Sequence, residues 1–147
     1  MVIYELGIVN NGVLLVSKEY YKELNIIFDP SLRAGFFTAI NYIATELFSD
    51  TIESFDLQNF KIIFLSRTYN APNESDIIAY GIGDKRVNLK LAKDALTRIL
   101  DAFFQKYNYS EINSGNLNIY CEFEQIMDGI LGDLVKNYAD RLKSIFG

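Results

Sequence analysis

The start of the chain constrains the fold most, because it combines two apolar runs with a turn dipeptide between them. Residues 2–9 are almost continuously apolar and rich in β-branched side chains, and residues 13–16 repeat that character. Asn11-Gly12 between the two runs is a strong signal for a β-hairpin. A strand as apolar as the first is typical of the interior of a sheet that is covered on both faces. We therefore predict an N-terminal hairpin whose first strand is central.

The next segment predicts a helix that begins at Asp29-Pro30 and runs to about Phe48. Aspartate caps the first backbone N–H groups, and proline suits the first helical turn. Two apolar stripes follow at helical spacing: Leu32, Phe36, Ile40, Ile43 and Leu47 form one, and Phe37, Ala44 and Phe48 form the other. A helix with so wide an apolar sector is either deeply buried or binds a partner with the second stripe, since a helix on a small sheet usually leaves one face wet. The sequence leaves both interpretations open.

The remainder of the chain predicts three strands and two helices. They are expected as strands over 52–57, 60–66 and 77–82, a loop over 67–75, a helix over 87–107, a loop over 108–116, a short extended piece over 117–121 and a last helix over 123–146. Strands followed by helices favour an α+β class with a five-stranded antiparallel sheet and the element order β-β-α-β-β-β-α-α. The length suits one domain, so we expect residues 1–147 to form a single unit.

The composition narrows the functional classes. The chain has no histidine, which removes Ser-His-Asp and Cys-His catalysis and histidine-ligated metals. Its lone cysteine, Cys121, cannot form an internal disulfide and has no basic neighbour in sequence to activate it. A net charge of −5 without a block of Lys and Arg argues against nucleic acid as a partner. We therefore expect no catalytic residue, cofactor or metal, and we favour a binding or assembly module over an enzyme.

Two local patterns resemble ligand sites but lack the spacing that such sites need. Residues 81–85 (GIGDK) lack the Gly-Lys-Ser/Thr ending of a phosphate-binding loop, so we interpret them as a strand-to-helix turn. Glu124 and Asp128 lie four residues apart without the alternating oxygen ligands of a calcium loop, which favours a solvated helix face. No apolar run approaches the roughly 20 residues that span a bilayer, and the N-terminus does not look like a secretory signal. We expect a cytoplasmic protein.

The order and rhythm of these elements resemble a longin domain over nearly the whole chain. The similarity is carried by the hairpin, the capped helix, the three-strand meander and the terminal helices. Local similarity lies in residues 36–41 (FFTAIN), 52–55 (IESF), 59–64 (NFKIIF) and 123–135, which are similar to longins of the Mon1–Ccz1 type and to the small sigma and zeta chains of vesicle coats. The resemblance implies a longin-like, profilin-like α/β/α sandwich.

The same resemblance implies a non-enzymatic platform for small-GTPase regulation or for assembly of membrane-traffic complexes. The implied partner is a small GTPase or another longin- or roadblock-type chain in a homo- or heterodimer, with peripheral membrane association through partners. Pairing through the edge strand and the first helix implies protein-binding residues at Leu14, Val16, Phe37, Asn41, Ala44 and Phe48. The alternative is a small-molecule sensor of PAS-like or profilin-like fold, which predicts a closed apolar cavity.

Overall fold

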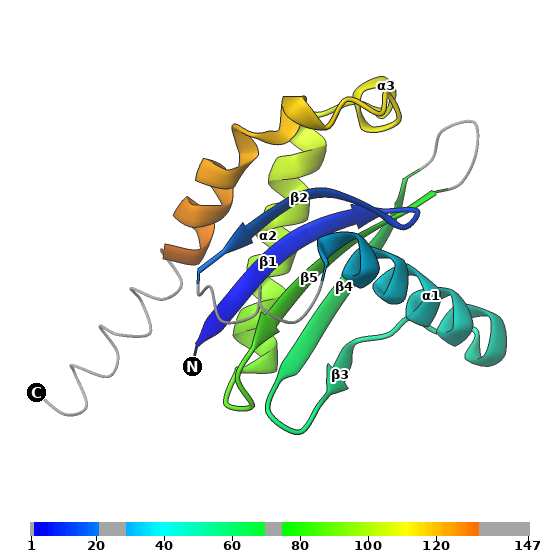
Figure 1. Ribbon diagram of the computed structural model, residues 1–147, viewed down its shortest axis with the longest axis vertical. Helices are drawn as coiled ribbons and strands as arrows, with labels where there is room; N and C mark the ends of the chain where they lie inside the picture. The colour runs from blue at the N-terminus through cyan, green and yellow to red at the C-terminus, as the bar shows by residue number, and fades with distance from the viewer. Residues whose placement is uncertain (1, 21–28, 70–74, 133–147) are drawn as a thin grey trace, which may run out of the picture.

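The computed structural model describes residues 2–20, 29–69 and 75–132 and shows an α+β fold. Five antiparallel strands form one open sheet in the order β2-β1-β5-β4-β3. Helices lie on both sides of it, with α1 on one face and α2 on the other (Figure 1). The strands are β1 Ile3–Asn10, β2 Val13–Glu19, β3 Ser54–Asp56, β4 Lys61–Tyr69 and β5 Ser75–Gly83. The helical elements are α1 Pro30–Phe48, α2 Leu89–Lys106, α3 Tyr109–Ile112, the 3₁₀ helix η2 Leu117–Tyr120 and a helix over residues 123–132.

The predicted N-terminal hairpin and its central first strand are confirmed. β1 pairs with β2 on one side and with β5 on the other. Asn11 and Gly12 have φ angles of 47° and 77°, so both turn residues adopt the left-handed conformation that matches the strand twist. The backbone N–H of Gly12 also donates a hydrogen bond to the Thr38 hydroxyl, 2.9 Å away, which joins the turn to α1.

The predicted bounds of the first helix are also confirmed. The Asp29 carboxylate accepts a hydrogen bond from the Ser31 backbone N–H at 2.9 Å, and the helix begins at the intervening proline. It ends at Phe48, after which Ser49 turns into the left-handed conformation with a φ angle of 52°. The helix therefore has a defined start and a defined stop.

The predicted meander is present, but two of its boundaries were wrong. The strand expected over 52–57 was too long, because β3 has only three residues, Ser54–Asp56. The loop expected over 67–75 was too long, because β4 continues to Tyr69 and β5 already begins at Ser75. Polar side chains that indicated a loop instead pair across this hairpin, as the Thr68 hydroxyl does with the Asp76 carboxylate at 2.6 Å.

The connection after α2 differs most from the prediction. α3 lies inside the segment expected to be a loop, and η2 replaces the expected extended piece, so the element order departs from β-β-α-β-β-β-α-α by two short helices. A capping box explains α3: Asn108 and Glu111 each bind the other's backbone N–H. The predicted last helix begins at residue 123 as expected, and its remainder after residue 132 lies outside the described residues.

The predicted helix over 87–107 is present as α2, which packs on one face of the sheet. Its apolar stripe of Ala92, Leu96, Ile99 and Phe103, continued by Tyr107 just after the helix, is buried. The strand-to-helix turn expected over residues 81–85 begins later than predicted, because residues 81–83 still belong to β5; the connection runs over 84–88, and Asn88 caps α2. None of the described helices is both long and apolar enough to cross a lipid bilayer.

Candidate functional site

The outer face of α1 carries an unusual amount of exposed apolar surface. Six of the nine large hydrophobic side chains that are exposed among the described residues belong to this helix: Leu32 (66%), Phe36 (49%), Tyr42 (64%), Ile43 (51%), Leu47 (71%) and Phe48 (75%). The helix contains only two charged residues, Arg33 and Glu46, and the first is buried. A surface helix normally presents charged side chains to water, so this face resembles an interface more than a solvated surface.

The position of α1 on the sheet explains why its outer face is bare. Its N-terminal half is anchored by Ala34 and Phe37, which are buried. The ring of Phe37 packs against those of Phe64 and Tyr80 at centroid distances of 5.1 and 4.7 Å. Residues 42–50 are exposed apart from a half-buried alanine, and this part of the helix extends past the strands at the right of Figure 1. The sheet therefore covers one stripe of α1 and only half of its length.

The structure separates the six residues that the resemblance placed in a protein-binding surface. Leu14 and Ala44 are half-buried, Val16, Phe37 and Asn41 are buried, and only Phe48 is exposed. Val16 packs among the apolar side chains between the sheet and α2, and Leu14 packs against those between the sheet and α1. A protein-binding role for this set stays a prediction, but its buried members cannot form a continuous surface in this conformation.

Of the two interpretations that the sequence left open for the stripe of Phe37, Ala44 and Phe48, burial holds for Phe37, whereas Phe48 is exposed. That stripe packs on the sheet through Phe37, and the other stripe, which includes Leu32 and Leu47, faces solvent. Hydrophobicity alone did not distinguish the two stripes, since both are apolar. The choice is made by a polar contact under the helix, which the sequence analysis missed.

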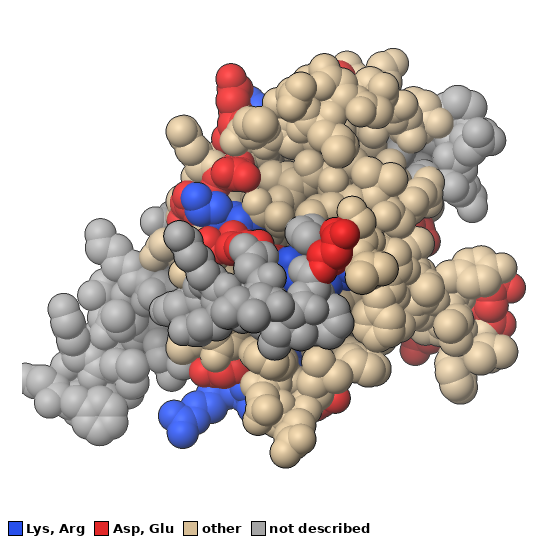
Figure 2. All heavy atoms as spheres, in the orientation of Figure 1, with Lys and Arg blue, Asp and Glu red and all other residues tan. Residues whose placement is uncertain are grey.

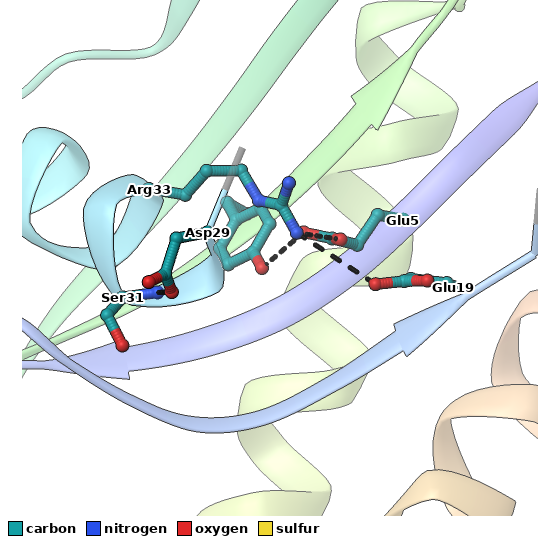
Figure 3. Close-up of polar contacts among 6 residues, drawn as sticks. Glu5, Glu19, Asp29, Ser31 and Arg33 are labelled. Atoms are coloured by element: carbon teal, nitrogen blue, oxygen red, sulfur yellow. Dashed lines mark hydrogen bonds and ion pairs between the residues drawn. The ribbon is translucent and has the colours of Figure 1, made fainter. Parts of the chain in front are cut away.

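This contact is a buried ion pair that fixes α1 against the sheet (Figure 3). Arg33 Nη2 lies 2.6 Å from Glu5 Oε1, and Tyr80 Oη donates a hydrogen bond to Glu5 Oε2 at 2.6 Å. Arg33 Nη2 also lies 4.0 Å from a carboxylate oxygen of Glu19. Glu5 is fully buried in β1. A lone carboxylate inside an apolar strand was the available sequence signal for such a pair, because a buried charge needs a partner.

The surroundings of Glu5 are built to hold this network. A Cβ at Gly7 would lie 2.5 Å from ring atoms of Tyr80, so the glycine makes room for that ring. Burial raises the pKa of Glu5 above its ordinary value of 4.5, and the Tyr80 hydrogen bond and the Arg33 charge offset this only in part. Burial and the nearby carboxyl also raise the pKa of Tyr80. Its hydroxyl therefore stays protonated and serves as a donor.

The raised pKa of Glu5 gives an expected pH dependence of stability. The folded state binds this proton more tightly than the unfolded chain, so the contribution of Glu5 is complete below a pH of about 4.5 and is lost as pH rises through the raised pKa. We expect the unfolding free energy of the native protein minus that of Glu5→Gln to fall as the pH rises from about 4.5 through the raised pKa of Glu5. Urea unfolding at several pH values measures this difference. A difference that grows with pH would show that the Arg33 charge outweighs burial.

The pair of acidic residues Glu124 and Asp128 and the lone cysteine were the other positions that the sequence singled out. A carboxylate oxygen of Asp128 lies 3.7 Å from Lys18 Nζ, so this residue links the last described helix to β2. Within residues 2–20, 29–69 and 75–132, no group of three or more His, Cys, Asp or Glu side chains is placed to hold a metal ion. Cys121 is exposed at the end of η2.

Comparison with known proteins does not assign the chain to a family. No protein-family model matches the chain, and no curated protein matches it in sequence. The functional argument therefore rests on the exposed face of α1 and on the contacts that orient this helix.

Proposed function

We propose that this protein is a longin-like, non-enzymatic interaction module that dimerises through α1 and acts in small-GTPase regulation or in assembly of membrane-traffic complexes. The observation that carries the proposal is the exposed row of Leu32, Phe36, Ile43 and Leu47, here called the α1 stripe. Apolar stripes of this kind on a soluble protein favour contact with another protein surface, because their burial removes apolar area from water.

The spacing of the α1 stripe is self-complementary. When two copies of α1 lie antiparallel about the midpoint between residues 39 and 40, Leu32 of one copy faces Leu47 of the other, and Phe36 faces Ile43. A two-fold symmetric interface requires this reciprocal matching of one surface with itself. Ala39, which is exposed near the midpoint, is small enough to let the two helices approach closely. The geometry therefore favours a second copy of the chain, or a close relative with the same pattern, as the partner.

Charge supports the same contact. The chain has a net charge of −5, so two copies repel each other over most orientations. The α1 stripe avoids this repulsion because Glu46 is the only exposed charged residue of its helix. A partner that approaches along α1 meets apolar side chains instead of carboxylates.

The small-GTPase and membrane-traffic part of the proposal is supported by the longin resemblance. The structure has the hairpin, the capped helix and the meander in the order on which that resemblance rests. Capture from native lysate on the immobilised protein tests this part. Enrichment of a small GTPase by the native chain but not by a variant with a damaged α1 stripe is the expected result, whereas equal recovery by both would contradict the use of this surface.

Leu47→Glu is expected to weaken the dimer at least tenfold, because placing a carboxylate in an apolar interface costs more than about 1.4 kcal/mol. Leu47 is 71% exposed, so its replacement leaves the fold intact. Sedimentation equilibrium measures the dissociation constant. Gln105→Glu is the matched control, since it adds the same charge at an exposed position of α2. A native protein that stays monomeric at about 100 µM, or a Leu47→Glu variant that dimerises as well as the control, would contradict the proposal.

The alternative function, a small-molecule sensor, requires a closed apolar cavity that is large enough to hold a ligand. The apolar cavity between α2 and the sheet, lined among others by Leu6, Ile63 and Leu96, has a volume of about 20 Å³. That space holds roughly one water molecule, whereas ligand pockets span about 300–1,000 Å³. This cavity gives the sensor interpretation no support.

A further inference from the structure

The Arg33 guanidinium beneath the start of α1 faces two carboxylates, which come from neighbouring strands (Figure 3). Glu5 of β1 and Glu19 of β2 stand opposite each other in the antiparallel register. Side chains at such positions lie close together on one face of the sheet, so two negative charges there repel each other. Arg33 Nη2 lies 2.6 Å from a carboxylate oxygen of Glu5 and 4.0 Å from one of Glu19. The two carboxylates therefore compete for one cation.

The two carboxylates differ in their access to water. Glu5 is fully buried, whereas the side chain of Glu19 is 23% exposed. Burial raises the pKa of Glu5, the Tyr80 hydrogen bond and the Arg33 charge lower it, and the Glu19 charge raises it. Water stabilises the negative charge of Glu19 but not that of Glu5. When the pH falls, a proton from water therefore neutralises Glu5 while Glu19 still carries its charge.

The other polar groups near Glu5 do not replace Arg33. Tyr80 Oη of β5 donates a hydrogen bond to Glu5 Oε2, and burial raises its pKa, so it stays a neutral donor. The Asp29 carboxylate accepts a backbone N–H of its own helix, and Lys18 reaches the last described helix. The sequence of α1 contains no cation besides Arg33. The far end of α1, at the right of Figure 2, shows acidic side chains and no basic ones.

A small movement separates the two contacts of the guanidinium. Charge-assisted hydrogen bonds are about twice as strong as neutral ones, so protonation of Glu5 weakens its contact with Arg33. A movement of Nη2 by about 1 Å brings it within hydrogen-bonding distance of Glu19. Rotation about the bonds of the arginine side chain is enough for this movement. Ala34 and Phe37, which are buried, keep α1 on the sheet meanwhile.

We propose that Glu5, Glu19 and Arg33 form a proton-operated switch, in which uptake of a proton by Glu5 transfers the Arg33 guanidinium to Glu19. The transfer moves the polar anchor of α1 from the central strand β1 to the edge strand β2, and loss of the proton to water reverses it. Because α1 carries the α1 stripe, the switch adjusts how that surface is held on the molecule. The switch acts within one chain, so failure of the dimer proposal leaves it standing.

Nuclear magnetic resonance of the full ¹³C,¹⁵N-labelled chain tests the switch. As the pH is lowered from about 7.5 to about 4.5, we expect the carboxyl ¹³C signal of Glu5 to report its protonation. With the same midpoint, the nuclear Overhauser contacts of the Arg33 side chain should pass from Glu5 to Glu19. The Leu47→Glu variant should give the same result, because the transfer needs no dimer. Contacts of Arg33 that stay with Glu5 throughout, or a Glu5 carboxyl that remains ionised down to about pH 4.5, would overturn the proposal.

Two variants that each remove one charge test the roles of the two carboxylates. In Glu5→Gln, which keeps the shape of the side chain, Arg33 should contact Glu19 at every pH of the titration. In Glu19→Gln, its contact with Glu5 should persist, because no second carboxylate competes. Glu46→Gln is the matched control, since it removes an exposed carboxylate of α1 and should behave like the native protein. An Arg33 side chain that still leaves Glu5 in the Glu19 variant, or that still responds to pH in the Glu5 variant, would overturn the assignment.

Discussion

Replacing Arg33 by methionine is expected to lower the unfolding free energy by about 3–5 kcal/mol, the typical result of removing one partner from a buried ion pair. The Glu5 carboxylate is fully buried and would keep only its hydrogen bond from Tyr80. Because burial already raises the pKa of Glu5, the variant can lower this cost by taking up a proton, so the loss should be smaller at acidic pH. Urea unfolding followed by circular dichroism measures the change.

The double variant Glu5→Gln, Arg33→Met is the control for this prediction. It removes both charges, so it should recover a large part of the stability that the single Arg33 variant loses. The resulting interaction energy isolates the pair from the packing of the two side chains. A single Arg33 variant that unfolds within about 1 kcal/mol of the native protein would contradict the role of the pair in holding α1.

Phe103→Ala is expected to destabilise the protein by a similar amount, about 3–5 kcal/mol, as is usual when a buried phenylalanine is truncated. Phe103 is fully buried in α2, and its ring contacts those of Tyr107, Tyr120 and Phe123 at centroid distances of 5.0, 5.6 and 5.4 Å. Two of these partners belong to η2 and to the helix over residues 123–132. The cavity would therefore loosen the C-terminal part of the described chain first.

Hydrogen exchange and urea unfolding together measure this effect. We expect the amides of residues 117–132 to lose protection before those of the sheet. Phe104→Ala is the matched control, because this neighbouring side chain is only half-buried. Equal destabilisation by the two variants would show that the aromatic cluster is not what attaches the C-terminal elements to α2.

The elements that the sequence predicted well have strong local signals. Asn11-Gly12 defines the hairpin turn through the left-handed conformation of both residues, and Asp29-Pro30 defines the start of α1 through a side-chain cap. These signals act over a few residues, so they are visible without knowledge of the tertiary structure. The burial of α2 was equally predictable, because that helix has one apolar side and one charged side.

The orientation of α1 was not predictable in the same way. Its two stripes are both apolar, and the contact that selects between them joins Arg33 to Glu5, which are 28 residues apart. The contact between β2 and η2 depends on a still longer range, since these elements are about a hundred residues apart in the sequence. Short elements such as α3 span too few residues to show a periodicity, and only the capping pair at Asn108 and Glu111 indicated it.

The dimer through the α1 stripe is tested most directly by disulfide cross-linking of defined positions. Leu32→Cys and Leu47→Cys are prepared separately in a Cys121→Ser background, mixed and oxidised under mild conditions. The antiparallel arrangement places residue 32 of one copy against residue 47 of the other, so the mixed 32–47 disulfide should form faster than either symmetric one. Preferential formation of 32–32 and 47–47 disulfides, or no cross-link above that of a Gln105→Cys control, would contradict an antiparallel dimer through the α1 stripe.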